Sequence, residues 1–170
     1  QAQAAPNDPL FINQWYLQSA QPAAVDALGA WDITTGDTDV VVAVLDTGIR
    51  YDHPDLGRVS NGGRVLPGYD FVSGESNGTF LVANDNNGRD ADASDPGDWL
   101  TTADKSEPIF ANCTTSNSSW HGTRVAGMIA ATTNNSSGIA GGTWGSPLLP
   151  VRVLGKCGGR DSDILAGMRW

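Results

Sequence analysis

Two spacings of apolar residues alternate along the chain. Segments rich in β-favouring apolar residues occupy residues 40–45, 65–72 and 148–154, and the first and last of them are typical of buried strands. Small or apolar residues at helical spacing occupy residues 21–33, 119–131 and the stretch after residue 160. Strands that alternate with helices predict an α/β fold with a mainly parallel sheet. We expect the first run to be a central strand of that sheet.

The last helical stretch places Ile164, Leu165 and Met168 on one face, which we expect to be buried. The chain stops at Trp170, inside this stretch. It starts with Gln1 in place of a methionine, and no basic and apolar leader precedes it, so we expect a mature form from which any leader has been removed.

Two residues with catalytic chemistry lie at the ends of predicted elements. Asp46 directly follows the first strand run, and His121 opens the small-residue helix. Taken singly, an Asp before Thr47-Gly48 is often only a turn residue, and a lone histidine is more often structural. Taken together, they indicate an acid–base pair, because a carboxylate can accept the Nδ1 proton of an imidazole and leave Nε2 to take a proton from a nucleophile.

The residues around this pair resemble the subtilisin-like serine proteases. Residues 44–49 and 53–56 are similar to the aspartate motif of that family, and residues 121–127 are similar to its histidine motif. The order, Asp before His, is that of subtilisin. The segments 85–99 and 151–159 most resemble secreted subtilases of Gram-negative bacteria, including the extracellular proteases of the sheep-footrot pathogen.

The third motif of the family, a Gly-Thr-Ser-Met-Ala run with the nucleophilic serine, is absent from the sequence, and so is the oxyanion-hole asparagine. The resemblance therefore implies that residues 1–170 are the N-terminal part of a single catalytic domain with the three-layer subtilisin-like fold. Alone, this part is expected to be inactive, and a C-terminal segment would supply the serine. In the complete enzyme Asp46 would orient His121, which would act as general base and then as general acid.

Two other functions were weighed. The chain can instead be an inactive truncation fragment that binds calcium without its own catalysis. A metal hydrolase is poorly supported, because the only histidines are His53 and His121 and neither lies in a zinc-type spacing.

The resemblance also implies a substrate site after the third strand run. The backbone around Leu154, Gly158 and Gly159 would pair with an extended peptide, through hydrogen bonds that do not depend on substrate side chains. A simple glycine turn is the competing interpretation of the same residues.

Calcium is the expected cofactor, at two places. By resemblance, the first site combines Asp8, Asp55 and Asn134 with main-chain oxygens of the loop from Thr132 to Ile139. The second lies in an acidic loop whose spacing resembles a compact calcium loop without the glutamate and helices of an EF-hand. A disordered acidic loop is the alternative. The candidate residues of this second site are Asp85, Arg89, Asp90 and Asp92.

Composition narrows the list of partners. The 19 acidic and 10 basic residues give a net charge of −9, which argues against nucleic acid. No stretch approaches the roughly 20 apolar residues of a membrane span. The resemblance to subtilases implies a secreted, extracellular protein made as a zymogen, with protein or peptide substrates. In such a protein the even pair Cys113 and Cys157 favours a disulfide, and two free buried thiols are the alternative.

Overall fold

The computed structural model describes residues 5–19 and 21–170, and the chain divides into two compact units. The first unit contains the described part of Gln1–Val42 together with Tyr51–Leu66 and Val125–Leu148. The second contains Ala43–Arg50, Pro67–Arg124 and Leu149–Trp170. Gln1, interpreted above as the start of a mature form, lies outside the described residues.

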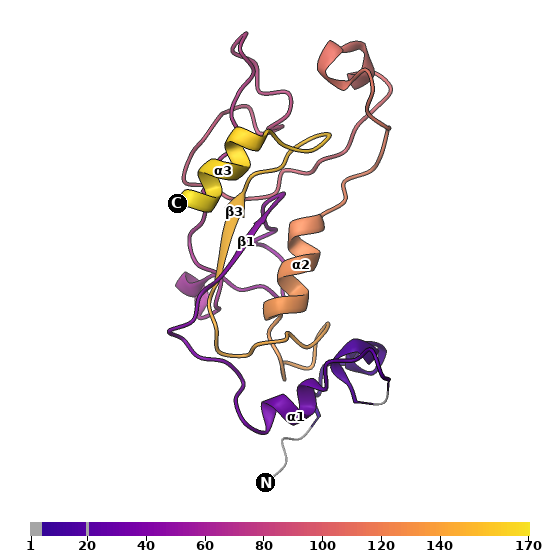
Figure 1. The fold of residues 1–170 in the computed structure, drawn as a ribbon, viewed down its shortest axis with the longest axis vertical. Coiled ribbons are helices and arrows are strands. Elements are labelled where there is room, and N and C mark those ends of the chain that lie inside the picture. Colours follow the sequence, from indigo (N-terminus) through magenta and orange to yellow (C-terminus); the bar gives the residue numbers. More distant parts are fainter. Residues whose placement is uncertain (1–4, 20) are drawn as a thin grey trace. The chain divides into compact units, whose positions relative to one another are not determined.

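Three strands form one sheet among the described residues: β1 (Val42–Asp46), β2 (Tyr69–Asp70) and β3 (Leu148–Arg152). Their order is β1-β3-β2, and β2 runs parallel to β3. Figure 1 shows β1 beside β3. The β1 strand also runs with β3, because the N–H of Val42 donates to the carbonyl of Pro147 and the N–H of Val153 to that of Asp46. The predicted parallel sheet is confirmed.

Within the sheet of the described residues, β1 does not take the central buried place that was predicted for residues 40–45. β1 lies at its edge, and Val40 and Val41 before it are exposed. β3 takes the central place, and four of its five residues are buried. A continuous apolar run shows that a segment is a strand, but its place in the sheet depends on its neighbours.

Helix α3 (Asp161–Arg169) packs on the sheet through a face that the sequence did not predict. Ile164 does pack against the core cluster that contains Val151 and Val153, but Leu165 and Met168 are 49% and 68% exposed. The fully buried positions are Asp163 and Gly167. A Cβ on Gly167 would lie 2.7 Å from the Val153 side chain, so the helix approaches the strand through its glycine.

The second unit has another small core beneath its long loops. Its buried residues are Val72, Val82, Ala83, Leu100 and Phe110, with the half-buried Cys113 packed against them. Cys113 and Cys157 form a disulfide, as the sequence favoured. Short 3-10 helices across both units occupy Phe11–Asn13, Trp15–Leu17, Val59–Asn61, Asp104–Ser106 and Pro108–Phe110.

Helix α1 (Ala27–Trp31) in the first unit is much shorter than the predicted 21–33. Asp26 caps it, accepting a hydrogen bond from the Gly29 N–H at 3.4 Å, and its left-handed φ of 51° turns the chain into the helix. One core cluster of this unit consists of Phe11, Leu17, Ala27, Trp31 and Ala140. Within the described ranges, none of the helices has the length and apolar character needed to cross a bilayer.

Candidate active site

Asp46 and His121 meet in the second unit. Asp46 is the last residue of β1, and His121 is the first residue of α2 (His121–Ala130). Nδ1 of His121 lies 2.7 Å from Oδ2 of Asp46. Since a carboxylate only accepts, this contact makes Nδ1 the protonated nitrogen and leaves Nε2 as the acceptor. The Asp46 residue is 8% exposed and the His121 side chain 63%, so the imidazole remains accessible while its partner is shielded.

The carboxylate of Asp46 is held in place by the backbone. Its Oδ1 accepts a hydrogen bond from the Thr47 N–H at 2.7 Å. Its own carbonyl accepts from the N–H groups of Val153 and Leu154 at 2.8 and 3.2 Å. The end of β1 is therefore fixed to the residues that follow β3, and the side chain has one oxygen left for the imidazole.

Glycines let the strand end and the helix start approach closely. A Cβ on Gly122 would lie 2.3 Å from the carbonyl oxygen of Gly48 and 3.2 Å from the Asp46 Cβ. Gly48 has a φ of +94°, and a Cβ there would lie 2.7 Å from the Ala93 carbonyl. The glycines that follow Asp46 and His121 are thus explained by contact distance.

The predicted substrate residues form a tight turn. The N–H of Gly155 donates to the carbonyl of Gly158 and the N–H of Gly158 to that of Gly155, while the N–H of Leu154 donates to Asp46. Peptide pairing by Leu154 and Gly158 would have to use their carbonyls, which favours the glycine-turn interpretation for Gly158. A role for Gly159 in substrate binding stays a prediction. The turn is anchored by the disulfide between Cys113 and Cys157.

The first unit brings together the residues predicted for the first calcium site. Asp8 and Asp55 are both 3% exposed, and neither pairs with a basic side chain in the described ranges. Asp8 accepts from the backbone N–H groups of Asn134 and Asn135 at 2.9 and 3.3 Å. Asp55 accepts from the Asn135 side-chain amide at 2.7 Å and from the Ile139 N–H at 3.2 Å.

Two further contacts in the loop from Thr132 to Ile139 affect whether it can bind a cation. Thr132 donates through its N–H to the Asp55 carbonyl, and Gly138 leaves space beside the Asp55 carboxylate, where a Cβ would lie 2.2 Å from Oδ2. Two buried carboxylates without a cationic partner fit a hard cation with oxygen ligands. Asn135, which contacts both carboxylates, was not among the predicted ligands, because the sequence could not distinguish it from Asn134.

Comparison with known proteins identifies the family. The family model described as Subtilase family matches residues 37–170. This chain belongs to the subtilase family. It is 46% identical over 167 residues to the extracellular basic protease of Dichelobacter nodosus, and 44% identical over 169 residues to an extracellular protease of Xanthomonas campestris. The matches cover 98% and 99% of this chain but only 26% of each relative.

A solved structure agrees with this assignment. The chain is 46% identical to a protease of Pseudoalteromonas arctica, with a TM-score of 0.79 over 98% of this chain and 44% of that one. The chain thus spans about a quarter of the length of the two curated relatives and less than half of the solved one. The expected α/β subtilisin-like fold is confirmed, and subtilases generally bind calcium.

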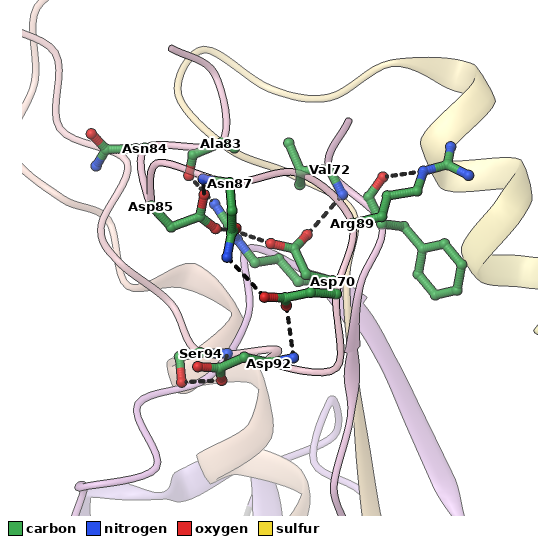
Figure 2. A network of polar contacts seen from close by, with 12 residues as sticks. Asp70, Val72, Ala83, Asn84, Asp85, Asn87, Arg89, Asp92 and Ser94 are labelled. Atoms are coloured by element: carbon green, nitrogen blue, oxygen red, sulfur yellow. Dashed lines mark hydrogen bonds and ion pairs between the residues drawn. The ribbon is translucent and has the colours of Figure 1, made fainter. Parts of the chain in front are cut away.

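The acidic loop of this subtilase is ordered by its own hydrogen bonds (Figure 2). The Asp90 carboxylate accepts from the Asn87 side-chain amide and the Asp92 N–H, both at 2.8 Å, and Asp92 accepts from the Ser94 N–H and hydroxyl. In the described part of the chain, no three acidic, histidine or cysteine side chains gather in a way that could hold a metal ion. A calcium ion at either predicted site would therefore need main-chain or amide oxygens.

Two members of the predicted second calcium site have protein partners. Arg89 donates from NH2 to Asp163 at 2.7 Å and from Nε to the Phe71 carbonyl at 3.0 Å, so its guanidinium is a charge partner and no ligand. Asp85 is paired with the guanidinium of Arg152. One Asp85 oxygen is thus used by Arg152, and a second calcium ion in this loop stays a prediction.

Arg152 is the important residue that sequence reasoning missed. It is 1% exposed and also contacts the Asp70 carboxylate and the Ala83 carbonyl. Asp70 is fully buried, and burial raises its pKa to about 7 despite the opposing charge of Arg152. The only signal in the sequence was a lone arginine in an apolar strand run, which predicts a buried ion pair but not its partner.

Proposed function

We propose that this chain supplies the aspartate and histidine of a secreted serine endopeptidase. The observation that carries the proposal is the 2.7 Å contact between Asp46 Oδ2 and His121 Nδ1, with the other face of the imidazole accessible. That geometry suits an imidazole whose Nε2 removes the proton from a serine hydroxyl and later protonates the leaving amine. Protein or peptide bonds are the proposed substrate.

The nucleophile comes from outside residues 1–170 in this proposal, because the sequence contains no Gly-Thr-Ser-Met-Ala run. A C-terminal segment, either continuous with this chain or associated with it, would bring the serine and the oxyanion hole. This assigns residues 1–170 to the first part of one catalytic domain. The extracellular names of the two relatives support secretion, and synthesis as a zymogen remains part of the proposal.

Calcium is proposed at the site of Asp8 and Asp55. The buried carboxylates would supply charged oxygens, with the Asn134 or Asn135 side chains and loop carbonyls completing the ligands. When bound, the ion would neutralise the two carboxylates and tie the N-terminal segment to the loop after α2. It takes no part in the chemical step.

Fluorophosphonate labelling tests the proposal. The complete protease, purified with whatever segment carries the serine, should be labelled on that serine and should hydrolyse a peptide substrate. His121→Ala should abolish nearly all labelling and turnover, and Asp46→Asn should lower kcat by about four orders of magnitude through the wrong imidazole tautomer. Full activity in either variant would refute the assignment. Absence of any labelled serine would favour the alternative, a calcium-binding fragment without catalysis.

A further inference from the structure

Residues 95–98, a turn in the second unit, place two carboxylates near the start of the histidine helix. Asp95 is 5% exposed and Asp98 is half-buried. Neither carboxylate has a role in the proposed chemistry or in the predicted calcium sites. Burial raises the pKa of Asp95, so a nearby donor is needed to keep its charge.

Asp95 reaches the helix through Thr47. The Thr47 hydroxyl donates to Oδ2 of Asp95 at 2.7 Å and accepts from the N–H of Gly122, the second residue of α2, at 3.1 Å. A hydroxyl has only one proton, so donation to an acceptor-only carboxylate directs its lone pairs toward the helix. Thr47 is also the neighbour of Asp46 in the chain, so this bridge joins the acid to the helix that carries the base.

Asp98 repeats the arrangement through Ser119. The Ser119 hydroxyl donates to Oδ2 of Asp98 at 2.7 Å and accepts from the N–H of His121 at 3.2 Å. The Ser119 N–H donates to the other oxygen of Asp98 at 2.5 Å. The first N–H groups of a helix have no partners within the helix, and here the first two are satisfied by hydroxyls that carboxylates orient.

The turn itself is rigidly attached to the end of β1. The N–H of Asp95 donates to the Ile49 carbonyl and the N–H of Ile49 to the Ala93 carbonyl, both at 3.0 Å. The second Asp95 oxygen accepts from the Gly97 N–H at 2.8 Å, and the Asn84 side chain donates to the Gly97 carbonyl at 2.8 Å. The two carboxylates are therefore fixed relative to the strand that presents Asp46.

We propose that Asp95 and Asp98 are positioning residues for catalysis, which act through the hydroxyls of Thr47 and Ser119 to fix the first turn of α2 and so the ring of His121 against Asp46. This inference rests on the proposed function. A misplacement of about 1 Å in a catalytic group can cost about 100-fold in rate. Hydrogen bonds that fix the first two residues of α2 should therefore affect turnover.

Hydroxyl variants of the complete protease test the inference. Thr47→Val should lower kcat by about tenfold with KM changed by less than about twofold, because the acid–base pair is displaced and the substrate groove is not. Thr47→Ser should restore most of kcat. Ser119→Ala should behave as Thr47→Val, and Asp95→Ala should match Thr47→Val, since Asp95→Ala removes the acceptor of the same bridge. Matched controls are Thr115→Val and Asp161→Asn, two exposed residues of the same unit.

A double-mutant cycle separates positioning from general stability. With His121→Ala as background, Thr47→Val should change the residual rate by less than about twofold, because the residue it acts through is gone. An equal loss in both backgrounds, or full kcat in Thr47→Val, overturns the inference while leaving the proposed function intact. If Thr47→Val does not fold, Ser119→Ala decides by the same criteria. A parent protease without any activity or labelling overturns the proposed function and this inference together.

Discussion

Removal of the buried Arg152 side chain should strongly destabilise the protein. Arg152→Met keeps the volume of the side chain but leaves the fully buried Asp70 carboxylate without its cationic partner. Breaking a buried pair from one side costs about 3–5 kcal/mol in the free energy of unfolding. The Asp85 carboxylate and the Ala83 carbonyl lose the same donor, which places the expected loss toward the upper end of that range.

The loss of stability in Arg152→Met should depend on pH, in a direction set by the protonation of Asp70. Its folded-state pKa of about 7 lies above its ordinary value of 3.8, so the folded state holds the proton more tightly than the unfolded state. The stability contributed by this group is present below pH 3.8 and is lost as the pH rises through about 7. Without Arg152 the charged form is costlier still, so Arg152→Met should lose more stability at pH 8 than at pH 5.

Urea unfolding of the fluorophosphonate-inhibited protease, in which autolysis cannot occur, measures the effect at both pH values. Arg152→Met combined with Asp70→Asn should recover part of the loss at pH 8, because no buried charge then remains at position 70. Arg169→Met, which removes an exposed arginine at the end of α3, is the control and should change the free energy of unfolding by less than about 0.5 kcal/mol. A loss below about 1 kcal/mol for Arg152→Met at pH 8 would refute the reasoning.

Three further predictions concern calcium, close packing and the disulfide. Calcium should raise the thermal midpoint of the protease and chelation should lower it, whereas Asp55→Asn should blunt both responses; equal responses in variant and parent would exclude this site. Gly122→Ala should lower kcat by at least about tenfold, because its Cβ would lie 2.3 Å from the Gly48 carbonyl, while Gly127→Ala, with its nearest contact at 3.7 Å, should be active in the same assay. Cys113→Ser combined with Cys157→Ser should lower the free energy of unfolding by about 4 kcal/mol, from the chain entropy of the 44-residue separation; an unchanged denaturant midpoint would contradict this.

The contact between Asp46 and His121 is an example of what local sequence pattern can predict. Asp46 and His121 each lie at the end of an element that its own residues specify, a β-branched run and a small-residue helix. The carboxyl end of a strand and the start of a neighbouring helix are where side chains of such folds meet, so the 2.7 Å contact followed from motif and element type. The disulfide was likewise predicted from the count of cysteines.

The partners of the buried charged residues in the second unit could not be predicted from local sequence pattern. Arg152 and Asp70 are 82 positions apart, and the residues around each of them in the sequence do not indicate that the two form an ion pair. The burial of Asp163 follows from Arg89, which is 74 positions away and which the sequence placed in a calcium loop. Long-range ion pairs depend on which segments the fold brings side by side. The composition gives the number of charged residues but not which of them are partners.

By itself, the sequence predicted the Asp46–His121 pair and the α/β class and favoured the disulfide, because each depends on residue type and short-range spacing. Only the tertiary structure decided which face of α3 is buried, which strand is central, and that the turn at Asp95 and Asp98 supports the histidine helix. Those outcomes depend on backbone approach distances and on hydrogen-bond partners supplied by distant segments. Such contacts exist only once the chain is packed.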